Sequence, residues 1–208
     1  GVDEGTEAAE GTDSQPATTG DSIDAELQKV QASDELDDEL KKDCVARLQK
    51  AKEWLESRRE WSGKRKLAET ELAAVPKRVA EVRETLARPV EAPAPELPAN
   101  ATIAQLESRL VEMRQQVESA EADASAKQQA IEKRATRLAE LAKEIVNLEK
   151  RSSETKHQLD DSVPADQLSK IKRTEQLARW QATTQQLAAL KAQRRHLEAA
   201  SELMPLER

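Results

Sequence analysis

The sequence predicts an all-α fold: an elongated antiparallel coiled-coil hairpin or three-helix bundle with a disordered acidic N-terminal tail. Three observations support this prediction. Charged residues make up 35% of the 208 positions, Phe and Tyr are absent, and Gly occurs only five times. A heptad pattern continues over the second half of the chain, and proline-bearing joints separate the helical segments. Compact enzyme folds built on parallel sheets are disfavoured, because such sheets need continuous apolar runs.

The acidic tail is expected over residues 1–21. Residues 1–22 contain six acidic residues and no basic residue, so they carry nearly all of the net charge of −7. The other residues are mostly Gly, Ala, Thr and Ser, which cannot bury enough apolar surface to fold. The remainder of the chain is almost neutral. This balance disfavours nucleic acid as a partner, because nucleic-acid binding requires a basic face.

The first helical arm is expected over residues 22–87. Asp21 or Ser22 is placed to cap its start. Ser33 precedes two acidic residues and resembles a second cap, which leaves two alternatives, a break near residue 33 or one continuous helix. Pro76 removes a backbone hydrogen bond and is expected to kink or divide the arm. Apolar residues recur at helical spacing along it, as in Leu40, Cys44, Leu48, Ala51 and Leu55.

A proline-rich joint is expected over residues 88–101, followed by a long heptad helix over 102–159. Four of the eight prolines lie in the joint, which favours an extended, stiff segment. Thr102 and Gln105 fit a capping box at the start of the helix. Of the 17 heptad core positions that start from Ile103 and Leu106, 13 are apolar, which is typical of a coiled coil.

A turn over residues 160–164 and a third helix over 165–208 complete the prediction. Two aspartates and a proline mark the turn. Because the first and second long helices are similar in length, we expect the second helix to fold back along the first, either within one chain or between two chains. The third helix then turns back again to form the bundle.

The sequence predicts no catalytic, cofactor-binding or metal-binding residues. His157 and His196 have no ligand set at metal spacing, so we interpret them as solvated surface residues. Cys44 has no second cysteine to pair with, and we interpret it as a small core residue, with a thiol that joins two chains as the alternative. Carboxylates alternate with Lys and Arg, as on solvated helix faces. We therefore expect a protein that is not an enzyme.

Tryptophans and basic clusters are the remaining candidates for a binding surface. Trp54 and Trp61 lie seven residues apart on one helical face. We interpret them as packing anchors, and the alternative is an exposed patch for a partner or a membrane surface. The basic clusters at 58–59, 64–66 and 194–195 are offset by nearby acidic residues. Stretches without a charged residue, such as Leu97 to Leu106, are far shorter than the roughly 20 residues of a membrane span.

The order of the proline-bearing joints resembles a known family. The chain reads VPKR at 75–78, IAQLE at 103–107 and ELMPLER at 202–208, with the proline-rich joint and the heptad helix between them. Over about residues 35–208 this order is similar to the N-terminal periplasmic coiled-coil (porin-type) region of large MscS/MscK-like mechanosensitive channels. The segment around Trp54 also fits that region.

This resemblance implies a non-catalytic module on the periplasmic side of a bacterial inner membrane. It implies self-association, or contact with other channel subunits through helix seams, together with contact to the cell envelope. The sequence begins at Gly1 and contains no signal peptide, membrane span or pore segment, so we expect a fragment of a longer channel. The alternative is a soluble cytoplasmic coiled-coil tether or scaffold protein, which would need no signal peptide.

Overall fold

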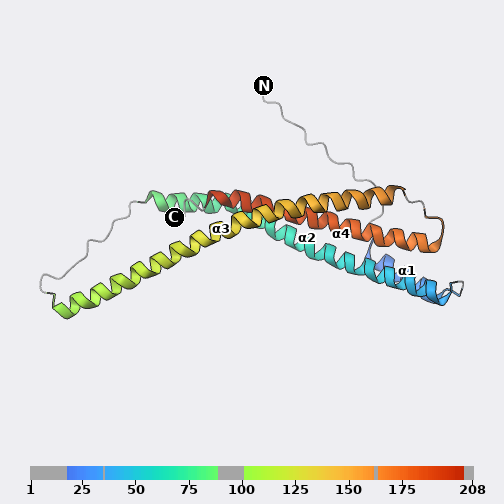
Figure 1. Ribbon diagram of the computed structural model, residues 1–208, viewed down its shortest axis with the longest axis horizontal. Helices are drawn as coiled ribbons and strands as arrows, with labels where there is room; N and C mark the ends of the chain where they lie inside the picture. The colour runs from blue at the N-terminus through green and yellow to red at the C-terminus, as the bar shows by residue number, and fades with distance from the viewer. Residues whose placement is uncertain (1–17, 35, 89–100, 162–163, 204–208) are drawn as a thin grey trace, which may run out of the picture.

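The computed structural model describes residues 18–34, 36–88, 101–161 and 164–203, and every regular element in them is helical (Figure 1). The elements are α1 (Gly20–Ala32), α2 (Asp38–Ala87), α3 (Ile103–Asp161), α4 (Gln167–Ala199) and the short 3₁₀ helix η1 (Ala200–Glu202). The prediction of an all-α helical bundle is confirmed. The expected acidic tail and the proline-rich joint lie almost entirely outside the described residues.

Side-chain caps set the start of the first two helices, although not the caps expected from the sequence. Thr19 caps α1, and its hydroxyl accepts a hydrogen bond from the Ser22 N–H at 3.3 Å while the Ser22 hydroxyl accepts from the Thr19 N–H. Ser22 is therefore the third helical residue and not the cap. The helix ends before Ser33, and Asp37 caps α2 by accepting from the Leu40 N–H at 2.7 Å.

Helix α2 continues through Pro76 to Ala87, so the proline does not divide it. The capping box at the start of α3 is present: the Gln105 side chain accepts from the Thr102 N–H at 2.9 Å. Helix α3 extends to Asp161, and Asp166 caps α4. Helix α4 ends at Ala199, where η1 follows, so the third long helix is shorter than the range 165–208 expected from the sequence.

The pairing of the long helices differs from the expected pairing. Helix α4 packs against α2 and runs in the same direction, and α3 packs against α4 in the opposite direction (Figure 1). Among the described residues, no Cα of α3 lies within 8 Å of a Cα of α2, so the second long helix does not fold back along the first. The reason lies in α4. It buries the small residues Ala178, Ala182, Ala189 and Ala192, which allow close approach of a neighbouring helix.

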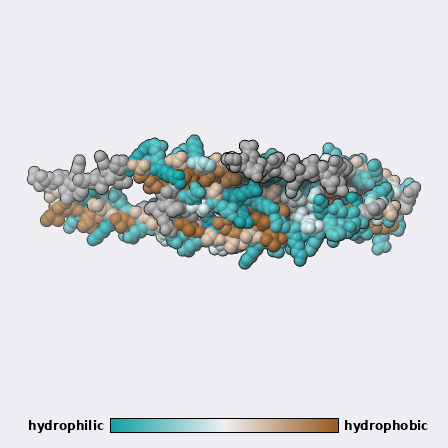
Figure 2. Space-filling model, turned by 90° about the horizontal axis from the view of Figure 1, so that it is seen from above, coloured by the Kyte–Doolittle hydropathy of each residue, from teal (hydrophilic) through white to brown (hydrophobic). Residues whose placement is uncertain are grey.

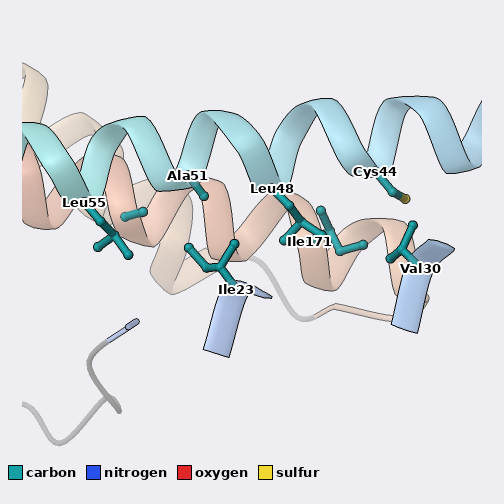
Figure 3. Close-up of a cluster of buried hydrophobic side chains, with 8 residues drawn as sticks. Ile23, Val30, Cys44, Leu48, Ala51, Leu55 and Ile171 are labelled. Carbon is teal, nitrogen blue, oxygen red and sulfur yellow. The ribbon is translucent and has the colours of Figure 1, made fainter. Parts of the chain in front are cut away.

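Three apolar clusters follow one another along the bundle. The first joins α1, α2 and α4 through Ile23, Val30, Cys44, Leu48, Ala51, Leu55, Ile171 and Ala178. Figure 3 shows side chains of this cluster, among them Leu48 of α2 and Ile171 of α4, meeting between the helices. The second joins α3 and α4 through Leu141, Ile145, Leu148 and Leu190. The third joins the end of α2 to Leu203 through Val75 and Val79. Aliphatic and small residues are sufficient for such thin cores, which explains how the fold forms without Phe or Tyr.

The first part of α3 extends beyond the bundle because α3 is much longer than its partner. Helix α3 has 59 residues and α4 has 33. At a rise of about 1.5 Å per residue, these helices are roughly 90 Å and 50 Å long. Residues 103–130, called the arm below, are all exposed, and they project from the bundle in Figure 1.

Candidate functional site

The described residues contain little that could support chemistry. They hold no group of three or more His, Cys, Asp or Glu residues that could bind a metal ion. Cys44 is fully buried, and this burial raises the pKa of its thiol. Its burial in the first apolar cluster confirms the interpretation of Cys44 as a core residue. The protonated thiol is also a poor nucleophile. Among the same residues, no helix has the length and hydrophobicity of a membrane span.

The two histidines differ in their surroundings. His157 is exposed, and its Nδ1 lies 2.6 Å from Asp161 on the same helix. His196 Nδ1 lies 3.4 Å from Glu71 of α2, and its side chain is only 22% exposed. His196 therefore belongs to the contact between α2 and α4, and its interpretation as a solvated surface residue was wrong. Spacing along the sequence could not reveal this contact, because Glu71 lies on a different helix.

Both tryptophans of α2 act as packing anchors, as expected. Trp54 packs against the first apolar cluster, and the guanidinium of Arg179 lies 5.8 Å from its ring centroid. Trp61 packs against the second cluster, with Lys64 Nζ 4.1 Å from its ring centroid. A groove of about 170 Å³ lies beside Trp61 between α2 and α4. It is smaller than the roughly 300 Å³ of a typical ligand pocket.

Three of the expected basic residues are engaged in side-chain contacts. Arg58 donates to the Gln181 side chain at 2.9 Å, which links α2 to α4. Arg65 and Arg194 each form an ion pair with a glutamate four residues later, at 2.7 and 2.6 Å. These contacts satisfy the guanidinium groups within the protein surface.

Arg134 marks the point where α3 leaves α4. Its Nη2 donates to the backbone carbonyl of Leu197, in the last turn of α4. A cation at this position interacts favourably with the helix dipole and satisfies one of the terminal carbonyls. Burial lowers the pKa of the Arg134 guanidinium, and its Nε has no hydrogen-bond partner among the described residues. The signal in the sequence was an arginine at an apolar heptad position.

The arm presents an apolar stripe that no described part of the chain covers. Ile103 is 76% exposed and Val117 56%, and Leu106, Leu110 and Met113 are also exposed. A groove of about 540 Å³ follows this face. The projecting end of the molecule shows hydrophobic side chains in Figure 2. Isolated apolar residues are common on protein surfaces, but a contiguous stripe usually indicates an interaction surface.

The family model described as "Mechanosensitive ion channel porin domain" matches residues 26–208. The chain belongs to this family. The match begins within α1 and includes α2, α3 and α4, so the bundle and the arm both lie inside the porin domain. The resemblance to the N-terminal periplasmic region of MscS/MscK-like channels is therefore confirmed.

The porin domain is a structural domain of channels and not a known enzyme family. Searches against curated proteins and against solved structures find no match to this chain. Within this porin domain, the candidate functional surface is the arm with its apolar stripe, because the remaining apolar clusters are buried between helices.

Proposed function

We propose that this chain is the extramembrane helical module of a mechanosensitive ion channel, located on the periplasmic side of a bacterial inner membrane. The observation that carries the proposal is the family match over residues 26–208, which includes all three long helices. The module is non-catalytic and acts through its surfaces. It associates with other copies of itself or with other subunits of the channel.

The construction of the bundle supports an interaction role. Interhelical ion pairs lie along its length, such as Arg47 of α2 with Glu175 of α4 at 3.0 Å and Lys191 of α4 with Glu149 of α3 at 2.8 Å. Lys52 of α2 also pairs with Asp24 of α1 at 2.7 Å. Exposed ion pairs contribute little stability individually, but they favour one helix register over others. The result is an extended rod whose long sides are available to partners.

Reporter fusions test the location. In the gene for the full-length protein, the coding sequence would be joined directly after residue 208 of this chain to that of alkaline phosphatase or β-galactosidase. Alkaline phosphatase is active only after export, and β-galactosidase only in the cytoplasm. We expect phosphatase activity alone. Activity of the β-galactosidase fusion alone would overturn the periplasmic location and favour a cytoplasmic tether or scaffold.

Patch-clamp recording tests the role in the channel. Residues 26–208 would be deleted from the full-length protein, and the currents under graded suction compared with the intact channel. We expect the channel to conduct and the tension at half-maximal opening to change, because the deletion removes surfaces that contact other subunits. Deletion of residues 1–17 alone serves as a control. An unchanged tension response in the long deletion would contradict the proposed role.

A further inference from the structure

The end of α4 is held by both of the other long helices. Arg134 of α3 donates to the backbone carbonyl of Leu197. Glu71 of α2 lies 3.4 Å from Nδ1 of His196, and the third apolar cluster fixes the chain just beyond η1 to α2. We call these contacts, which are all made by residues 196–203, the clasp.

The arm begins where the clasp lies. Within α3, residues 103–130 are all exposed, and Ile131 and Arg134 are the first residues that are partly buried. Helix α3 continues through this point, so its last contacts with α4 set the direction of the arm. At about 1.5 Å per residue the arm is roughly 40 Å long, and a rotation of about 10° at its base would move its far end by roughly 7 Å.

Arg134 occupies a heptad position that is apolar in the packed part of α3. One and two heptads later, Leu141 and Leu148 fill the same position and are buried in the second apolar cluster. Burial lowers the pKa of the Arg134 guanidinium, and its Nε has no hydrogen-bond partner among the described residues. Such a group costs free energy at a core position. Polar residues at such positions are best known for fixing how packed helices are aligned.

The acceptor of this hydrogen bond couples the two helices. The Leu197 carbonyl belongs to the last turn of α4, where the carbonyls lack partners within the helix. Because the bond joins a side chain of α3 to the main chain of α4, its geometry depends on the positions of both helices. Movement of the arm at its base therefore displaces or breaks the bond, and loosening of the end of α4 removes a support of the arm.

We propose that the clasp is a conformational switch. While it is closed, it fixes the direction of the arm relative to the bundle, and when it opens, the arm and the end of α4 become mobile together. This inference goes beyond the proposed function, because it concerns how the parts of one chain move and requires no particular partner or location. It provides a route by which displacement of the arm reaches the end of α4.

A distance measurement across the clasp tests this switch in the 208-residue chain. Spin labels would be attached at Gln116→Cys in the arm and at Glu60→Cys in α2, both exposed positions, in a Cys44→Ala background. The labelled chain would be diluted with unlabelled chain, so that double electron–electron resonance records distances within one chain. We expect a single narrow distance distribution while the clasp is intact.

Variants of Arg134 test the hydrogen bond. Arg134→Met fills the apolar position but cannot donate to Leu197, so the distance distribution should widen at least about twofold. Arg134→Lys retains a donor and should keep the distribution narrow. Arg137→Met is the matched control on the same helix, because Arg137 pairs with Glu140 and Glu144 of α3 itself. It should leave the distribution unchanged.

A variant on the α2 side of the clasp tests the coupling. Leu203 packs against α2 in the third apolar cluster. Leu203→Ala should loosen the end of α4 and widen the same distribution, whereas Leu86→Ala, at a position of α2 that is 57% exposed, should not. Hydrogen exchange over residues 197–203 should become at least about tenfold faster in both Leu203→Ala and Arg134→Met.

Three results would overturn the inference. They are a broad distribution with Arg134 intact, an unchanged distribution in Arg134→Met, and an unchanged distribution in Leu203→Ala. Circular dichroism at 222 nm checks that each variant is folded, and Arg134→Gln, which is shorter and stays polar, replaces a methionine variant that loses its helical signal. These outcomes are separate from the test of the proposed function. A periplasmic protein with unchanged distances would remove the inference alone, and a cytoplasmic protein with the expected distances would remove the proposed location alone.

Discussion

Ile145 and Val146 are neighbours in α3, but they lie in different environments. Ile145 is 5% exposed within the second apolar cluster, and Val146 is 64% exposed. A charged group at Ile145 would lose its hydration inside the core. We therefore expect Ile145→Asp to lower the free energy of unfolding by about 3–5 kcal/mol, whereas Val146→Asp should change it by less than about 0.5 kcal/mol. Urea unfolding followed by circular dichroism at 222 nm measures both. Equal effects would show that the buried face of α3 is misplaced.

Cys44 provides a probe of the first cluster. Its thiol is buried and its pKa is raised, so both access and thiolate formation oppose modification. We expect an aromatic disulfide reagent at pH 8 to react slowly with the native chain and rapidly after addition of guanidinium. Fast reaction of the native chain would contradict the described burial and would favour the alternative of a thiol that joins two chains.

Residue environments were predictable where they depended on local pattern. Cys44 lies in the apolar repeat of the first arm and is buried, and Trp54 and Trp61, which share one helical face, pack against the apolar clusters. His196 was not predictable, because its partner Glu71 is 125 positions away in the sequence. Arg134 interrupts the apolar heptad positions of α3, so the sequence marks it as unusual. Its acceptor, the Leu197 carbonyl, could not be predicted, because its position depends on where α4 ends.

Asp166 caps the start of α4. Its carboxylate accepts from the Ser169 N–H at 2.6 Å, and the hydrogen bonds from Ser169 hold its pKa below the ordinary value. A lowered folded-state pKa means that this stabilisation is present above the unfolded-state pKa and is lost as the pH falls through the folded-state value. We expect Asp166→Ala to lower the melting temperature at pH 7, and this difference from wild type to shrink as the pH falls below about 4.

The matched variant for this position is Asp166→Asn, which retains a capping oxygen without a titratable group. Its melting temperature at pH 7 should lie between those of wild type and the alanine variant. Differential scanning calorimetry between pH 3 and pH 7 gives all three curves. A constant difference between wild type and Asp166→Ala over that range would show that the carboxylate charge does not contribute.

Helix α3 should divide into two zones of different protection. Residues 138–159 lie against α4, whereas the arm is exposed along its whole length. Helical hydrogen bonds without tertiary packing open easily. At concentrations where the chain is monomeric, we expect amides of the arm to exchange at least about tenfold faster than those of the packed zone. Hydrogen exchange with mass spectrometry measures this, and uniform protection along α3 would contradict it.

The sequence indicated the helices better than their ends. The capping box at Thr102 follows a strong local rule and was found. The observed caps of α1 and α2 lie a few residues from the expected ones. Several acidic and hydroxyl residues near each helix start could serve as the cap, and the local sequence pattern does not rank them.

The elongated shape of the protein can be measured in solution. A compact domain of 208 residues would have a radius of gyration of about 17 Å. Because α3 alone is roughly 90 Å long, we expect small-angle X-ray scattering to give a much larger radius and a maximum dimension of at least about 90 Å. A radius near the compact value would contradict the described arrangement of helices.

The arrangement of the bundle could be predicted only in part. Heptad spacing shows that α3 needs a partner, but it does not say which helix supplies the partner. The contact between α4 and α2 is hard to predict from the sequence of α4. Much of the buried face of α4 is alanine, and its larger apolar residues do not follow a regular heptad spacing. The similar lengths of α2 and α3 favoured pairing of these two helices, but in the structure both of them pack against α4.

The three separate clusters have a mechanical consequence. They lie in series along the rod, and no single core holds all the described helices. A pulling force along the long axis would load the interface between the parallel helices α2 and α4 in shear. Rupture of one cluster would leave the other two closed, so the rod should lengthen in steps. Force–extension traces from optical tweezers would show these steps as separate plateaus, and a single abrupt rupture would rule out this behaviour.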